Sequence, residues 1–238
     1  TFGDGLNDDE TLPQLFADSI GRQERVLNLG FSGYGPQQFL RELQSGTYDS
    51  VIGPHPKLVV ILTSVIHAER CACKVHWARR GPRYIIENGK LILKGTCYEG
   101  PRLWWEEWLQ NSAAYRWLVA PYRRALSHDD VELYIQITLA VVNLARSKYG
   151  APAVVLYFNW DENYLRGTGF TNADIMQRMQ DGGAAVVDAS LGNEAAAGMA
   201  LNIPGDGHPT GLANRLRAAL LKNYLEQNMP GVLASNRN

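Results

Sequence analysis

The sequence predicts an α/β domain in which a parallel sheet carries helices on both faces. Four short runs rich in β-branched and other apolar residues have the composition of strands buried on both faces, at residues 25–29, 57–62, 153–158 and 184–188. Helical patterns surround and separate them, at residues 10–20, 36–46, 129–149, 171–181 and 210–227. Alternating strands and helices form βαβ units, so we expect a three-layer αβα arrangement around a flavodoxin-like parallel sheet.

Composition fits one globular domain spanning residues 1–238. Of these residues 45% are apolar and 20% are charged, enough to build and solvate a sizeable core. A net charge of −1, without a run of Lys and Arg interleaved with aromatic residues, argues against a nucleic-acid partner. No apolar stretch is long enough to span a bilayer. The sequence indicates neither the compartment nor the oligomeric state.

The order of the elements predicts a further strand before the first helix. In the flavodoxin-like order 2-1-3-4-5, the strand preceding that helix is central and has neighbours on both sides. Without it, two strands would face a gap, and each buried unpaired amide would cost about 1–3 kcal/mol. We therefore expect that this strand lies upstream of Thr1.

Residues 75–126 interrupt the alternation and form an expected insertion. Asn88-Gly89 separates two apolar runs in residues 84–93, which predicts a β-hairpin because both central turn residues need positive φ. Two amphipathic helical patterns follow, at residues 103–109 and 115–119.

The insertion leaves the carboxyl end of the strand that finishes near Thr63, at the sheet edge where ligands bind. A cap over the site is therefore expected, with Trp104 and Trp108 as substrate-binding candidates. The alternative is that these residues and Trp117 only pack the insertion onto the body of the domain.

The most specific chemical signal is the loop Gly205-Asp206-Gly207-His208-Pro209, just before a helix. An Asp and a His two residues apart can form the acid and base arms of a nucleophilic triad. The alternative is an Asx-type turn beside an incidental surface histidine.

This loop, together with the N-terminal Thr1-Phe2-Gly3, resembles the SGNH hydrolases, also called the GDSL esterase/lipase superfamily. In that family a Gly-Asp-Ser block often continues as Ser-Phe-Thr-Phe-Gly, so the resemblance implies a nucleophilic serine two residues upstream of Thr1. A rival alignment equates Gly3-Asp4-Gly5 with Gly-Asp-Ser, which puts Gly5 at the serine position and implies an inactive relative.

The resemblance also implies oxyanion donors. The second glycine of the family's block matches Gly33, where a backbone N–H must approach the substrate without a Cβ in the way. The family's asparagine is missing after the strand that ends near Thr63. His67 falls near that position and a ring N–H can donate instead, while a structural histidine is the alternative. Arg70 is one helical turn further on and is expected to face the same cavity.

The spacing between acid and histidine also departs from the common pattern. Many family members place the acid three residues before the histidine, where this chain has Gly205, but relatives of the alginate O-acetylation proteins have the two-residue spacing found here. Asp161 follows the strand at residues 153–158 and is expected to line the pocket or to cap its loop.

Other nucleophile and metal candidates have weaker patterns. Ser32 and Ser64 lack the strand-to-helix elbow that exposes a nucleophile. A zinc site from His67, Cys71, Cys73 and His76 has an uncommon ligand spacing, and the odd number of cysteines leaves at least one outside an intramolecular disulfide.

The sequence therefore predicts an ester hydrolase that needs no metal or organic cofactor and acts on a small-molecule or glycan ester. Transfer of an acetyl group to or from a polysaccharide is a second version of the same chemistry. The competing hypothesis is a catalytically silent SGNH-like domain that binds a glycan or a partner protein.

Overall fold

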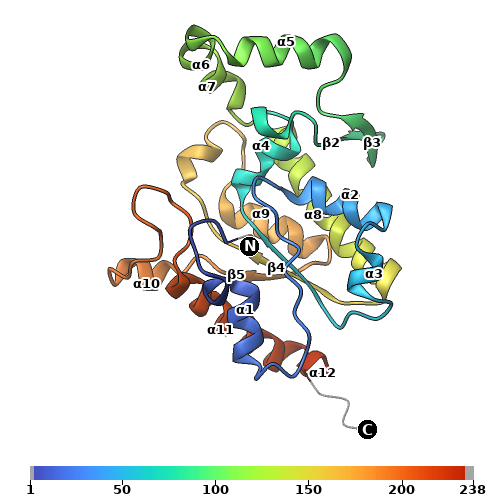
Figure 1. Ribbon diagram of the computed structural model, residues 1–238, viewed down its shortest axis with the longest axis vertical. Helices are drawn as coiled ribbons and strands as arrows, with labels where there is room; N and C mark the ends of the chain where they lie inside the picture. The colour runs from blue at the N-terminus through green and yellow to red at the C-terminus, as the bar shows by residue number, and fades with distance from the viewer. Residues whose placement is uncertain (1–2, 234–238) are drawn as a thin grey trace.

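The computed structural model describes residues 3–233 and has the α/β architecture that the sequence predicts (Figure 1). Its main sheet consists of β1 (Val59–Thr63), β4 (Ala153–Tyr157) and β5 (Ala185–Asp188), all parallel, in the order β1-β4-β5. Thr1 and Phe2, which carry part of the resemblance, lie outside the described residues.

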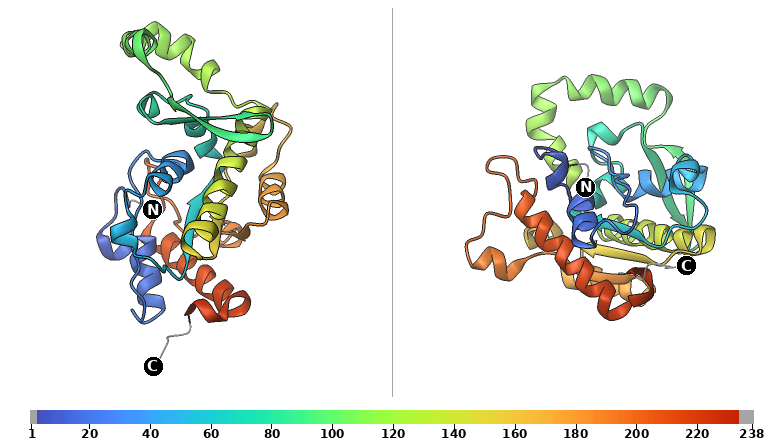
Figure 2. Two further views of the ribbon diagram at one scale, coloured as in Figure 1. Left: turned by 90° about the vertical axis from the view of Figure 1, so that its right-hand side faces the viewer. Right: turned by 60° about the horizontal axis from the view of Figure 1, so that its bottom comes forward.

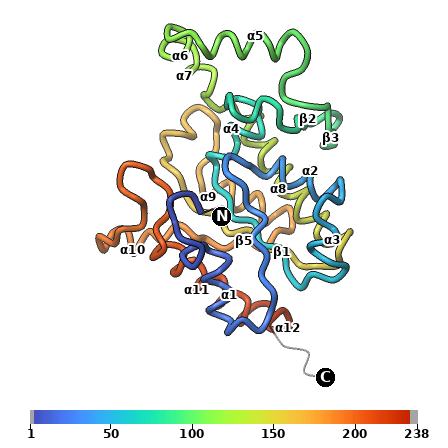
Figure 3. Tube along the Cα trace, viewed as in Figure 1, coloured from blue at the N-terminus to red at the C-terminus, as the bar shows by residue number. Residues whose placement is uncertain are grey.

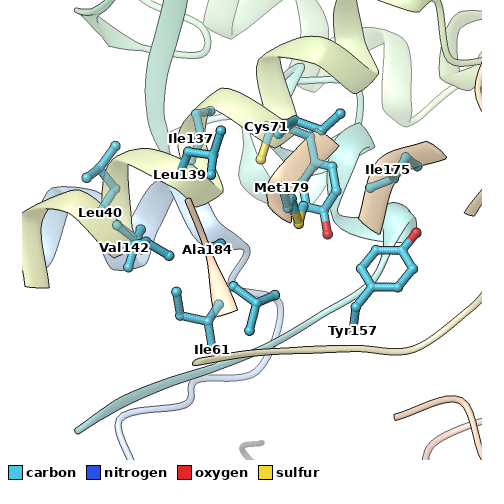
Figure 4. Packing of buried hydrophobic residues seen from close by; sticks show 14 of the residues in the cluster. Leu40, Ile61, Cys71, Ile137, Leu139, Val142, Tyr157, Ile175, Met179 and Ala184 are labelled. Carbon is cyan, nitrogen blue, oxygen red and sulfur yellow. The ribbon is translucent and has the colours of Figure 1, made fainter. Parts of the chain in front are cut away.

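Helices cover both faces of this sheet, and the alternation of side chains along β4 explains why. Ala153, Val155 and Tyr157 pack into one apolar cluster, whereas Val154 and Leu156 pack into another on the opposite face. The first cluster, part of which is drawn in Figure 4, is completed by α2 (Pro36–Ser45), α8 (His128–Tyr149) and α9 (Asn172–Asp181). The second is completed by α1 (Leu12–Ser19) and α11 (Gly211–Asn228). All five of these helices are predicted by the sequence.

Shorter elements connect these layers. They are α3 (Asp49–Ile52), α4 (Ala68–Cys71), α10 (Gly192–Ala196), α12 (Pro230–Leu233) and the 3₁₀ turns η1 (Asp8–Glu10), η2 (Val65–His67), η3 (His76–Ala78) and η4 (Glu162–Leu165). Among residues 3–233, no helix combines the length and the apolar character needed to cross a membrane.

The strand predicted at residues 25–29 does not form, which corrects the sequence analysis. This segment is drawn as the stretch of chain between α1 and α2 in Figure 3. A cavity of about 1270 Å³ is lined by this segment and also by β1, whose partner in the sheet is β4. A strand needs a neighbour about 4.8 Å away for its backbone hydrogen bonds. Residues 25–29 have no such neighbour among the described strands.

The expected hairpin is confirmed. Strands β2 (Pro82–Glu87) and β3 (Lys90–Thr96) pair antiparallel around Asn88 and Gly89, whose φ angles are +51° and +72°. The expected helices also form, as α5 (Gly100–Gln110) and α6 (Ala113–Leu118), and α7 (Ala120–Arg124) follows them. Figures 1 and 2 show that α5–α7 project from the body of the domain as an arm.

The three cysteines resolve into one disulfide and one thiol. Cys73 and Cys97 are bonded, which links the turn after α4 to the chain beyond β3. Cys71 is free and buried, and burial raises the pKa of its thiol to about 12. An odd number of cysteines leaves at least one outside an intramolecular disulfide, and in this structure that cysteine is Cys71.

Candidate functional site

Six of the predicted site residues surround the same 1270 Å³ cavity, at the carboxyl ends of the parallel strands. They are Gly33, His67, Arg70, Asp161, Asp206 and His208. Residues separated by up to 175 positions in the chain therefore meet where open parallel sheets bind ligands. The same cavity continues along the β1 edge that faces residues 25–29.

The Asp206–His208 pair has the geometry of an acid–base arm. The carboxylate of Asp206 contacts Nδ1 of His208, so this carboxylate orients the imidazole. A short β-bridge between Asn202 and Pro209 closes the loop, and Ile203 N–H donates to the His208 carbonyl at 2.7 Å. Nε2 of His208 is the ring nitrogen left to act on a hydroxyl.

Asp4 is not among the site residues predicted from the sequence, yet it lies opposite this imidazole. Its Oδ2 is 3.8 Å from His208 Nε2 and accepts a hydrogen bond of 3.0 Å from Ser32 Oγ. A Cβ placed on Gly5 would lie 3.6 Å from Asp206 Oδ2. Asp4 and Gly5 are thus adjacent to the acid–base loop, and the Gly3-Asp4-Gly5 pattern was their only sequence signal.

Gly33 sits in a tight turn that requires a glycine. The N–H of Tyr34 donates to the carbonyl of Phe31 at 3.2 Å, so Gly33 is the third residue of a β-turn, and its φ is +74°. A Cβ at Gly33 would come within 3.2 Å of the Trp77 ring. Both observations explain why this position carries a glycine.

His67 is held by a chain of hydroxyl groups. Thr63 Oγ1 lies 2.9 Å from His67 Nδ1 and 2.9 Å from the hydroxyl of Tyr134. Burial, with a smaller effect of the Arg70 charge, lowers the pKa of His67 well below its ordinary value, so the ring is neutral. When Tyr134 donates to Thr63 and Thr63 donates to Nδ1, the ring proton is on Nε2. In that tautomer His67 is a neutral hydrogen-bond donor.

Arg70 supports the glycine turn. Its guanidinium donates to the carbonyl of Tyr34, and its Cβ would lie 3.3 Å from a Cβ built on Gly35. Burial lowers the pKa of Arg70. Arg70 thus lines the cavity while it holds the turn that carries Gly33.

Asp161 caps the loop that follows β4, which is one of the two roles expected for it from the sequence. Its carboxylate accepts from the backbone N–H of Asn163 at 2.9 Å and from the side chain of Asn163 at 3.0 Å. It lines the cavity and also caps η4.

The structure does not bring Trp104 and Trp108 to this cavity. They lie on α5 in the projecting arm, with 65% and 55% of their surface exposed, and Trp108 stacks on Trp105. Neither residue lines the cavity, so the expected cap is not formed by these residues. Trp160 lines the cavity, and Trp77 flanks it at Gly33.

The weaker alternatives receive little support from the geometry. Cys73 is bonded to Cys97 and cannot serve in a Cys71/Cys73 zinc site. In the part of the chain that the structure describes, no three His, Cys, Asp or Glu side chains are arranged to hold a metal ion. Ser64 is fully buried, whereas Ser32 donates to Asp4.

Comparison of the chain with protein-family models, with curated proteins and with solved structures finds no match. The resemblance to the SGNH hydrolases therefore rests on the quoted residues alone.

Proposed function

We propose that this domain supplies the base, the acid and the oxyanion donors of an ester hydrolase of SGNH type, whose nucleophilic serine lies upstream of Thr1. The observation that carries the proposal is the Asp206–His208 pair, which shares one cavity with Gly33 and His67. A base, its orienting carboxylate and two candidate oxyanion donors are the parts that acyl transfer requires besides the nucleophile.

In the proposed reaction, Nε2 of His208 takes the proton of the serine hydroxyl as its oxygen attacks the ester carbonyl carbon. Asp206 holds the Nδ1–H tautomer and stabilises the imidazolium. The N–H of Gly33, the N–H of the serine and Nε2–H of His67 donate to the oxyanion. His208 then protonates the leaving alcohol, and a water molecule, activated by the same base, releases the acid.

The cavity beside β1 supports the upstream position of the serine. It is lined on one side by β1 and on the other by residues 25–29, and the flavodoxin-like order has its central strand between two such segments. A strand inserted there would pair with β1, and its carboxyl end would be near Gly33 and His208. The elbow that follows such a strand is where hydrolases of this architecture carry the nucleophile.

Two alternative functions each have a specific observation in their favour. The two-residue spacing of Asp206 and His208 favours acetyl transfer to or from a polysaccharide as the form of the reaction. The Asp4 carboxylate, 3.8 Å from His208 Nε2, favours a catalytically silent domain that binds a glycan or a partner, because a serine hydroxyl would need that side of the imidazole.

The test uses the chain extended by its natural upstream residues and a fluorophosphonate probe, which adds covalently to activated serines. We expect one label per chain, at the upstream serine. His208→Ala should abolish labelling and Asp206→Ala should weaken it. His128→Ala is the matched control, because His128 hydrogen-bonds the Thr168 carbonyl away from the cavity.

Labelling of the 238-residue chain at any residue between Thr1 and Asn238 would overturn the upstream position of the nucleophile. An extended chain that folds but takes no label would favour the silent binding domain.

A further inference from the structure

A second cavity, of about 480 Å³, lies at the base of the projecting arm and is rich in basic side chains. Its walls come from the loop at residues 72–76, from the start of β2, from the chain around Cys97 and from α5–α7. We call it the arginine pocket. Seven cationic side chains line it: Lys74, Arg79, Arg83, Arg102, Arg116, Arg123 and Arg124.

Four of these cations are neutralised by carboxylates. Arg123 pairs with Glu106 at 2.8 Å, and Arg124 pairs with Glu69 at 2.8 Å. Arg79 pairs with Glu107 at 3.3 Å, and Lys74 pairs with Asp130 at 2.6 Å. The pairs fix the walls of the arginine pocket, and Glu107 is shared with Arg80 at 3.1 Å.

The other three arginines leave the pocket with a net positive charge. Within residues 3–233, no carboxylate lies at ion-pair distance from Arg83, Arg102 or Arg116. Arg116 donates to the carbonyl of Gln110 at 3.2 Å, and the Arg102 guanidinium lies 4.8 Å from the centre of the Tyr98 ring. Like charges gathered around one small cavity repel each other, and a bound anion relieves this repulsion.

A histidine in the pocket wall lies close to two of the paired arginines. The pKa of His76 is lowered, first by burial and then by the charges of Arg79 and Arg124. Tyr98 and Tyr115 add aromatic surface and hydroxyl groups to the walls. The arginine pocket therefore combines excess positive charge with groups able to contact the rest of a ligand.

We propose that the arginine pocket binds a phosphate group that carries at least two negative charges, as in a phosphate monoester or a pyrophosphate. Guanidinium forks match phosphate oxygens in pairs, and three uncompensated arginines suit a multiply charged phosphate better than a single carboxylate. This site shares no lining residue with the 1270 Å³ cavity, so the proposal does not depend on the ester hydrolase.

The phosphate has two possible sources, a soluble phosphate ester and a lipid headgroup. Trp104, Trp105 and Trp108 are exposed on α5, the helix that also carries Arg102. Tryptophan side chains favour the interfacial region of a bilayer, and would enter it if the phosphate belonged to a lipid. A blue shift of tryptophan fluorescence on vesicles, absent with soluble phosphate, would report that source.

Two experiments measure binding to the 238-residue protein. Calorimetry measures the binding of inorganic pyrophosphate. Flotation measures the binding of phosphatidylcholine vesicles with and without phosphatidic acid. We expect Arg83→Gln, Arg102→Gln and Arg116→Gln each to weaken binding about tenfold, the loss of one charge-assisted contact. The triple variant should not bind. Arg215→Gln, an exposed arginine on α11 outside both cavities, is the matched control and should bind normally.

Thermal unfolding followed by circular dichroism checks that the variants fold, which we expect because the three arginines pair with no carboxylate. If a glutamine variant unfolds at a lower temperature than the unchanged protein, the lysine variant at the same position is used in its place. Lysine keeps the positive charge but lacks the two-pronged guanidinium, so it should still weaken binding. Pyrophosphate binding that the substitutions weaken supports a soluble ligand. Binding that is confined to phosphatidic acid vesicles and is weakened in the same way supports a lipid headgroup. Absence of both, or equal binding by the triple variant, would overturn the proposal.

Discussion

Replacing Gly33 with Ala should destabilise the domain by more than the same change at another left-handed glycine. Alanine in the left-handed region costs about 1–2 kcal/mol. The lower entropy of the unfolded chain offsets about 0.4–1 kcal/mol of that cost. The φ of Gly33 is +74°, so a net loss of roughly 0.5–1 kcal/mol follows from the backbone alone.

The neighbour at Gly33 adds a second cost. The new Cβ would lie 3.2 Å from Trp77 Cδ1, which is tighter than ordinary van der Waals contact, and 3.5 Å from Nε1. Moving the indole away from its preferred rotamer costs about 0.5–1.5 kcal/mol. The total is about 1–2.5 kcal/mol, and each kcal/mol corresponds to roughly 2–4 °C in Tm for a domain of this size.

The assay is thermal unfolding of Gly33→Ala beside Gly150→Ala. Gly150 has a left-handed backbone, with a φ of +65°, and open space around its Cβ position, so it carries the backbone cost without the contact. The difference between the two variants isolates the effect of Trp77. In a Trp77→Ala background, Gly33→Ala should cost no more than Gly150→Ala does. Equal Tm values for Gly33→Ala and Gly150→Ala in the otherwise unchanged protein would refute the assigned contact between the turn and the indole.

Four further predictions concern single residues. In the extended chain, His67→Ala should lower kcat for a short ester by roughly 10²–10³ with little change in binding, as loss of one oxyanion donor does; unaltered turnover would assign His67 to the scaffold. Because the pKa of His67 is lowered on folding, the unfolded state binds more protons, so the free energy of unfolding should fall as pH drops below about 6.5, and denaturant titrations of His67→Gln should show a weaker dependence. Without reductant, iodoacetamide should modify Cys71 only after unfolding, since the thiol is buried and its pKa is about 12; mass spectrometry of the native protein would reveal any exception. Changing Trp104 and Trp108 together to Ala should leave the ratio of rates on short and long acyl esters unchanged, because neither lines the large cavity, and a changed ratio would place the arm over the substrate.

Features set by neighbours in the chain could be predicted from the sequence. Asn88-Gly89 specifies a hairpin because its turn needs two positive φ angles, whatever surrounds it. Asp206 and His208 are two residues apart in one loop, so their contact follows from the local spacing. The helices were predictable for the same reason, since the apolar period of a helix is contained in a short window of residues.

Features that depend on partners far away in the chain could not be predicted. Asp4 faces His208 across 204 positions, and nothing near either residue indicates this. Residues 25–29 have the composition of a strand, but a strand forms only where a neighbour supplies hydrogen bonds. The pairing of Cys73 with Cys97 was equally open, because the sequence shows three cysteines and no geometry.

The sequence by itself determined the element types, the hairpin and the acid–base loop, because hydrogen bonds and apolar periodicity within a few residues decide them. Only the tertiary structure decided that the arm carries Trp104 and Trp108 away from the strand ends, and that arginines from β2, α5 and α6 share one pocket. Each of those outcomes depends on how separate elements pack. The free energy of such packing is a sum over contacts between residues far apart in the chain. A pattern within a short window of sequence contains no information about those contacts.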